Sequence, residues 1–132
     1  MRKKILVVDD NKHLLGLLRL NLKGQGFSIT TAANGIDAVQ KALTLAPDLV
    51  LLDLMLPGLD GFAVCETLRK HPLTASTPII IMTGMAGEFT RFAGFESGGS
   101  DFITKPVTTK ALLGKIKELL DSPPKIPASA AA

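Results

Sequence analysis

The sequence predicts an α/β fold: a five-stranded parallel sheet with strand order 2-1-3-4-5, covered on both faces by five helices. Three observations support this prediction. Short, continuous apolar runs recur along the chain, segments with helical spacing of apolar residues lie between them, and the two kinds of segment alternate. Continuously apolar runs suit strands that are buried on both faces, and strand-helix alternation favours right-handed parallel crossovers. The strand order is a common winding of such a sheet.

The five expected strands differ in the clarity of their pattern. Three are the apolar runs "ILVV" (5–8), "LVLL" (49–52) and "IIIM" (79–82). Two are weaker: "FSITTA", which begins at Phe27, and "FITK" (102–105).

The first two expected helices have clear stop signals. In "NKHLLGLLRLNL" (11–22) the apolar face ends before "GQG" (24–26), and "NGIDAVQKALTLAP" (34–47) ends before Pro47. The face of the first helix consists of Leu14, Leu15, Leu18 and Leu22.

The other three expected helices are also recognised by their apolar spacing or by residues that end a helix. "GFAVCETLRK" (61–70) is closed by His71-Pro72, and "GEFTRFAGFESGG" (87–99) by two glycines, with Phe92 and Phe95 one turn apart. The last, "TTKALLGKIKELLD" (108–121), has leucine and isoleucine at helical spacing, which indicates a helix that packs on the core.

Composition limits the class of protein. The 132 residues are 46% apolar and 20% charged, which is typical of one globular domain, and the net charge of +3 is scattered rather than gathered into a nucleic-acid-binding stripe. The lone Cys65 excludes an internal disulfide and is expected to be a small buried residue. No apolar run approaches the roughly 18 residues of a membrane span. We therefore expect a cytoplasmic protein without direct contact to nucleic acid or membrane.

The residues at the ends of the expected strands are unusually polar. Asp9 and Asp10 follow the first strand, Asp53 the third and Thr83 the fourth, and Lys105 ends the fifth. The carboxyl ends of parallel strands meet at one edge, where open α/β sheets bind ligands. Three carboxylates gathered there would repel one another, and Mg²⁺, which prefers oxygen ligands, would remove that cost. Three carboxylates, one Mg²⁺ and one lysine also sum to zero charge.

This set of side chains suits phosphoryl transfer, which depends on positioning and on neutralising charge. Mg²⁺, Lys105 and Thr83 could hold phosphoryl oxygens while one carboxylate attacks and forms an acyl phosphate. Asp53 is the best candidate because its strand is central. A single aspartate after an apolar run is more often a turn residue or helix cap. Five polar residues at the proper ends of four strands favour a site instead.

Four motifs carry a resemblance to a known family: "ILVVDDN", "PDLVLLDLMLPGLDG", "IIIMTG" and "GSDFITKPV". In this order and spacing they resemble the receiver domain of two-component response regulators, over about residues 3–121. The resemblance implies a flavodoxin-like, more specifically CheY-like, fold. It makes residues 1–121 one receiver domain and leaves 122–132, rich in proline and alanine, as a linker or tail. The implied function is a phosphorylation-controlled signalling switch, which is not an enzyme beyond its own phosphotransfer and dephosphorylation.

Position by position, the resemblance makes Asp53 the acceptor of a phosphoryl group from a phosphohistidine donor. Asp10 and Asp53 would bind Mg²⁺ directly, Asp9 largely through water, and Met55 through its backbone carbonyl. Lys105 would pair with the phosphoryl group. The residues that would shape the site are Pro57, Gly58, Gly61 and Pro106, the last of which matches the family's cis proline.

The family's switch consists of a hydroxyl and an aromatic residue, here Thr83 and Phe102. Thr83 would move toward the phosphoryl group, and Phe102 would turn inward to fill the vacated space. Plain core packing is the alternative for Phe102. The implied signalling face comprises the fourth helix, fifth strand and fifth helix, about 87–97 and 102–121, where Phe89 is either a partner contact or a partly buried flank residue.

The implied partners are a sensor histidine kinase or phosphotransfer protein and a downstream effector or fused output domain. The phosphodonor would dock near the first helix, where Leu17 and Leu20 lie off the apolar face and either contact it or are shielded by neighbours. Met55 and Met85 occupy positions that tune hydrolysis of the phosphoryl group. Neither side chain can hydrogen-bond an attacking water, so we predict slow self-dephosphorylation.

Two other functions remain open. A small aspartyl-phosphate phosphatase usually has a second carboxylate two residues after its nucleophile, where this chain has Met55, and a cap domain for which the chain offers no room. A receiver-fold scaffold that is never phosphorylated would not need the five polar strand-end residues. A nucleotide-binding P-loop is not supported, because "TGMAGEFT" has no lysine after its glycines.

Overall fold

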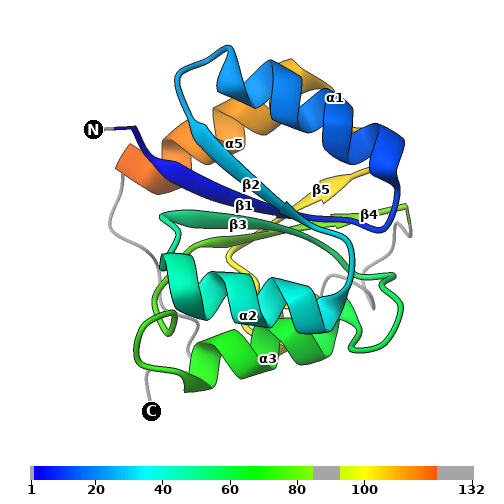
Figure 1. Ribbon diagram of the computed structural model, residues 1–132, viewed down its shortest axis with the longest axis vertical. Helices are drawn as coiled ribbons and strands as arrows, with labels where there is room; N and C mark the ends of the chain where they lie inside the picture. The colour runs from blue at the N-terminus through cyan, green and yellow to red at the C-terminus, as the bar shows by residue number, and fades with distance from the viewer. Residues whose placement is uncertain (1, 85–92, 122–132) are drawn as a thin grey trace.

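A central sheet lies between two layers of helices in the computed structural model, which describes residues 2–84 and 93–121 (Figure 1). The strands are β1 (Lys4–Val8), β2 (Ser28–Ala32), β3 (Leu49–Asp53), β4 (Ile79–Thr83) and β5 (Asp101–Thr104). The helices are α1 (Lys12–Lys23), α2 (Gly35–Leu45), α3 (Gly61–Lys70) and α5 (Thr109–Asp121). Residues 93–96 are also helical, residues 97–99 are not, and residues 87–92 of the expected fourth helix lie outside the described residues.

The five strands form one parallel sheet in the order β2-β1-β3-β4-β5, which confirms the predicted topology. In the centre of the sheet Val8 lies beside Leu52, and Asp53 beside Met82. This register brings the carboxyl ends of β1, β3 and β4 to the same edge. The residues that follow these strands are therefore neighbours in space, although they are far apart in the chain.

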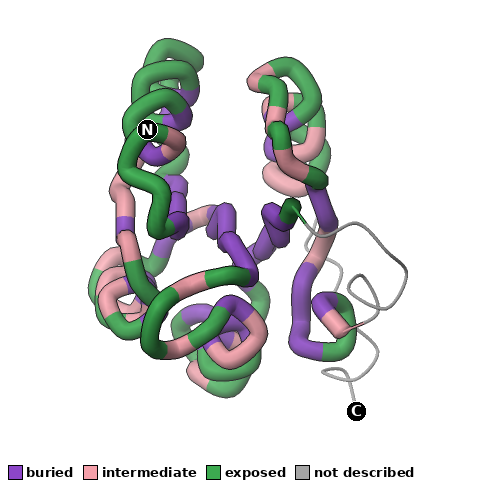
Figure 2. Tube along the Cα trace, turned by 90° about the vertical axis from the view of Figure 1, so that its right-hand side faces the viewer, coloured by how far each residue is buried: buried purple, intermediate pink, exposed green. Residues whose placement is uncertain are grey.

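Alternate residues of each strand face opposite cores, as the pleat requires. Val50 and Leu52 of β3 pack with α2, α3 and Phe102, whereas Leu49 and Leu51 pack with α1 and α5. Figure 2 shows that the buried positions follow the strands and that exposed positions lie on the outer sides of the helices. Continuous apolar runs are thus explained by burial on both faces.

The end of α1 corrects one predicted boundary. Gly26 has a φ of +94°, its N–H donates to the Lys23 carbonyl, and the Phe27 N–H donates to the Leu22 carbonyl. This pair of bonds is the glycine cap that the "GQG" motif predicts. Because Phe27 belongs to the cap, β2 begins one residue later than expected, at Ser28.

Several single-residue expectations can be compared with the structure. Cys65 is fully buried, as predicted, and burial raises the pKa of its thiol to about 12. Leu17 and Leu20 are 54% and 71% exposed, so the alternative that neighbours shield them is wrong. Phe95, which follows Phe92 by one turn in the expected fourth helix, is 44% exposed.

Other expectations fall outside the described residues: Met85, Phe89, Phe92 and the tail 122–132. None of the helices within 2–84 and 93–121 has the length and apolar character needed to cross a membrane.

Candidate functional site

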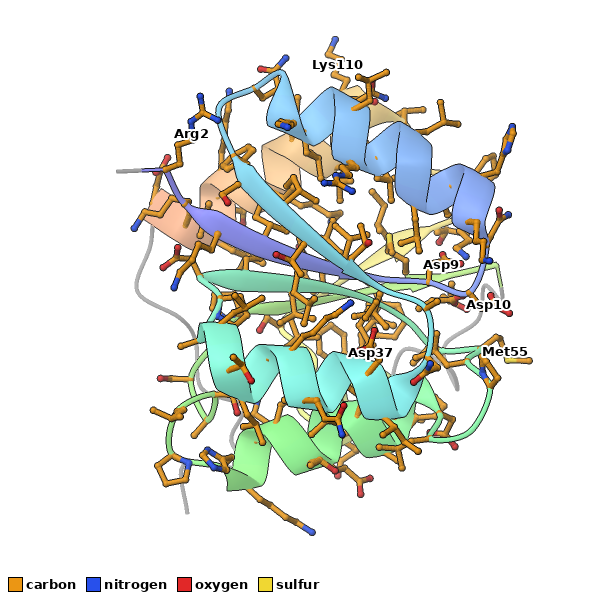
Figure 3. The ribbon with its side chains drawn as sticks, viewed as in Figure 1. Arg2, Asp9, Asp10, Asp37, Met55 and Lys110 are labelled. Atoms are coloured by element: carbon orange, nitrogen blue, oxygen red, sulfur yellow. The ribbon has the colours of Figure 1, made fainter. Side chains whose placement is uncertain are left out.

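Three carboxylates meet at the carboxyl edge of the sheet. Asp9 and Asp10 follow β1 and Asp53 ends β3, and one carboxylate oxygen from each lies within 4.8 Å of the others. Asp9 is completely buried, Asp53 is 3% exposed and Asp10 is exposed. Figure 3 places Asp9, Asp10 and Met55 at the same end of the sheet. The predicted convergence of these residues is confirmed.

Lys105 joins two of the carboxylates. Its Nζ lies 2.6 Å from Oδ2 of Asp9 and 3.2 Å from Oδ2 of Asp53. The second oxygen of each carboxylate accepts a backbone hydrogen bond, Asp9 from the Asn11 N–H at 2.9 Å and Asp53 from the Met55 N–H at 3.2 Å. The lysine therefore holds the two buried carboxylates side by side and offsets part of their repulsion.

The backbone after β5 aims this lysine. The Lys105 N–H donates to the Thr83 carbonyl at 2.8 Å, which continues the pairing of β4 and β5 beyond the last residue of β5. The bond between Lys105 and Pro106 is cis, as the resemblance implies. The side chain is only 25% exposed and reaches across β4 to the ends of β3 and β1.

The pKa values of the site follow from this crowding. Burial, followed by the nearby negative charge of Asp9, raises the pKa of Asp53, and the Met55 N–H and Lys105 only partly counter this. Burial by itself would lower the pKa of Lys105. The hydrogen bonds and charge attraction that Lys105 makes with Asp9 and Asp53 outweigh burial, so the pKa of Lys105 is raised. The site therefore holds a permanent cation and more negative charge than that cation neutralises. It is electrostatically suited to a further cation.

The loop between β3 and α3 packs so closely that glycine is required. A Cβ on Gly61 would lie 2.6 Å from the Leu54 Cα and would also overlap the Asp53 carbonyl. The Gly61 N–H donates to the Leu54 carbonyl at 3.1 Å, and the Asp60 side chain caps α3 by accepting from the Ala63 N–H. The start of α3 is thereby fixed against the backbone that carries Asp53.

Sequence reasoning missed two residues that support the site. Asn11 holds the Asp9 carboxylate through its backbone N–H and caps α1 with its side chain. Gly35 begins α2 where a Cβ would lie 2.7 Å from the Leu59 Cβ, so that helix α2 rests on the β3–α3 loop. In both cases the sequence signal was an asparagine at the start of a helix. Asn11 itself caps α1, and Asn34, which precedes Gly35, caps α2.

The two predicted switch residues are both buried. Thr83 is 1% exposed at the end of β4, and Phe102 is 3% exposed on β5. The ring of Phe102 lies 5.4 Å from that of Phe95, at an interplanar angle of 56°. Phe102 also belongs to the core formed with α3, so the core packing expected for it is present in this structure.

Comparison with known proteins agrees with this geometry. The family model of the response regulator receiver domain matches residues 5–117. The alkaline phosphatase synthesis transcriptional regulatory protein PhoP of Bacillus subtilis is 42% identical over 120 residues, which cover 91% of this chain and 49% of PhoP. The chain thus spans about half the length of this relative.

Two solved structures are similar along almost their whole length. A putative response regulator from Chloroflexus aurantiacus has a TM-score of 0.88 and 34% identity, covering 92% of this chain and 100% of the other. The receiver domain of the sensor histidine kinase PA1611 from Pseudomonas aeruginosa, described with a magnesium ion coordinated in its active site cleft, has a TM-score of 0.86 and 29% identity, with coverage of 92% and 100%. On the family match, the sheet topology and the strand-end carboxylates, the chain belongs to the response regulator receiver domain family of two-component systems.

Proposed function

We propose that this receiver domain is switched by phosphorylation of Asp53. The observation that supports the proposal is the placement of Lys105, whose Nζ contacts both Asp9 and Asp53. A cation beside the nucleophile offsets the charge that a phosphoryl group brings, which is the main requirement of phosphoryl transfer. Asp53 is the last residue of β3, at the carboxyl edge of the sheet, and is 3% exposed.

The proposed step is a displacement at phosphorus. An Asp53 carboxylate oxygen attacks the phosphorus of a phosphohistidine, the P–O bond forms as the P–N bond breaks, and the freed imidazole keeps the electron pair and takes up a proton. With acetyl phosphate the P–O bond to acetate breaks instead. Asp53 must be ionised to attack, and Lys105 favours the ionised form. The product is an acyl phosphate on β3.

The donor set fits Mg²⁺, because its side-chain ligands are carboxylate oxygens that carry excess negative charge. Asp10 and Asp53 would bind the ion directly together with the Met55 carbonyl. Asp9 would act largely through water, as the family resemblance implies. When bound, the ion would supply positive charge to the phosphoryl oxygens. The magnesium described for the Pseudomonas aeruginosa receiver supports the same cofactor here.

The finer parts of the proposal concern the switch and its partners. Thr83 would move toward the phosphoryl group and Phe102 would take up the vacated space. This would alter the signalling face of about 87–97 and 102–121, of which 93–97 and 102–121 lie within the described residues. The protein would be cytoplasmic, and its phosphodonor would be a sensor histidine kinase or phosphotransfer protein that docks at α1, where Leu17 and Leu20 are exposed. The output would be a downstream effector or a fused domain following residues 1–121, with 122–132 as a linker or tail.

The test is the intact mass of the protein after incubation with acetyl phosphate, with and without Mg²⁺. We expect one added phosphoryl group in the presence of Mg²⁺, and none for Asp53→Asn. Asp48→Asn is the matched control, because Asp48 precedes the opposite end of the same strand, where it accepts from the Lys4 backbone. An adduct on Asp53→Asn would contradict the assignment, and no adduct on any variant would favour the scaffold alternative.

A further inference from the structure

The ring of Phe102 lies against Gly94, in the space that the Cβ of any other residue at position 94 would occupy. A Cβ built on Gly94 would lie 2.5 Å from the Phe102 Cε2 and would also overlap its Cζ. Ordinary contacts between carbon atoms begin near 3.5 Å. The burial of Phe102 to 3% exposure therefore depends on the missing side chain of a residue eight positions earlier in the chain.

The backbone of Gly94 is tied in place on this side. Its carbonyl accepts from the Gly99 N–H at 2.9 Å, and the Phe95 carbonyl accepts from the Gly98 N–H at 3.0 Å, with Gly98 at a φ of +109°. These are the two bonds of a glycine helix cap. The Gly98 carbonyl in turn accepts from the Arg69 Nε at 2.8 Å. A side chain at position 94 would therefore displace the ring more readily than the backbone.

The ring of Phe102 also packs against Phe95, the residue after Gly94. Its ring lies 5.4 Å from that of Phe102 and is itself 44% exposed. A tilted aromatic pair at this distance is favourable but does not enclose the ring. Phe102 thus packs against a position that lacks a side chain and against a ring that is partly exposed.

We propose that Gly94 is a positioning residue of the switch: its lack of a side chain sets the balance between the buried and the exposed orientation of Phe102. The inference rests on the proposed function, in which the phosphorylated state needs the buried orientation. Overpacking at this contact, as in Gly94→Ala, should shift the balance about tenfold or more toward the exposed ring. Because coupling is reciprocal, the same variant should be phosphorylated to a lower level at a given concentration of acetyl phosphate.

The composition of the chain makes the ring directly observable. The sequence contains no tyrosine and no tryptophan, so Phe102→Tyr introduces a single fluorophore at the switch position. Acrylamide quenching of that fluorophore reports its exposure in the unphosphorylated protein. We expect strong protection in Phe102→Tyr, and quenching close to that of the urea-unfolded chain when Gly94→Ala is added.

The matched control is Gly114→Ala, since Gly114 is also helical but a Cβ there would meet nothing within 4 Å. Added to Phe102→Tyr, it should leave quenching unchanged. Equal protection in the Gly94→Ala and Gly114→Ala proteins would overturn the inference.

A double-mutant cycle covers the case in which Gly94→Ala lowers stability instead of freeing the ring. With Phe102→Leu, which removes the ring, Gly94→Ala should no longer lower the urea midpoint and should behave like Gly114→Ala. A loss of stability that is the same with phenylalanine and with leucine at position 102 would place the clash elsewhere and overturn the inference.

Phosphorylation separates this inference from the proposed function. Normal phosphorylation of Gly94→Ala, together with an exposed ring, would overturn the link between ring orientation and Asp53. No phosphorylation of the unmodified chain would refute the proposed function, and the quenching and stability arms would still decide whether Gly94 sets the orientation of Phe102.

Discussion

The hydrogen bonds of Arg69 stabilise the amino edge of the sheet, opposite the candidate site, and their contribution to stability can be measured. Arg69 lies at the end of α3, and its guanidinium donates to the carbonyls of Gly98 at 2.8 Å and Thr77 at 2.6 Å. Weaker bonds of 3.3 to 3.4 Å reach Thr74, Ala75 and the Ser100 hydroxyl. The segments before β4 and before β5 are thus joined through one side chain.

Arg69→Met keeps most of the side-chain volume and removes every donor. A hydrogen bond from a charged donor contributes about 1.5 to 3 kcal/mol, so loss of the two short bonds corresponds to roughly 3 to 6 kcal/mol. Part of this is offset, because burial lowers the pKa of Arg69 and so disfavours its charged form. We therefore expect the free energy of unfolding to fall by about 3 kcal/mol.

The measurement is urea unfolding followed by circular dichroism in the far ultraviolet. Arg69→Lys keeps the charge but loses the planar fork, so it should fall between the parent and Arg69→Met. Lys70→Met is the matched control because the neighbouring Lys70 is exposed, and it should change stability by less than about 0.5 kcal/mol. If Arg69→Met costs no more than Lys70→Met, the network does not stabilise the fold and the reasoning is refuted.

Three further predictions concern the site. Gly61→Ala should lower the free energy of unfolding by about 2 kcal/mol and slow phosphorylation by acetyl phosphate, since its Cβ would displace the backbone of Leu54 and Asp53; urea unfolding and intact mass measure the two effects. Asp53→Asn should stabilise the metal-free protein. Folding raises the pKa of Asp53, so ionisation of this carboxyl group disfavours the folded state. The urea midpoint of Asp53→Asn should therefore equal that of the parent below about pH 4 and exceed it increasingly as the pH rises. An advantage that shrank with rising pH would contradict that sign. Met55→Asn should speed loss of the phosphoryl group, because the exposed residue 55 would then be able to hydrogen-bond water; an unchanged decay by intact mass would count against this role.

Local pattern was sufficient for most of the fold. Runs of four apolar residues, as at the start of β3 and β4, favour burial on both faces, which a parallel sheet covered by helices provides. The strand order and the convergence of Asp9, Asp10 and Asp53 followed from that sheet. Errors arose where a local hydrogen bond decided the boundary, as at Phe27, whose N–H closes the cap of α1 instead of extending β2.

The sequence by itself determined the fold class, the strand order and which carboxylates meet, because periodicity and strand ends are properties of neighbouring residues. Tertiary structure alone decided that one lysine contacts both Asp9 and Asp53, that Phe102 lies against Gly94, and that Leu17 stays exposed. The physical reason is that these contacts depend on register and on the depth at which each helix packs. Both are set by the summed packing of the whole core, and no short segment carries that information.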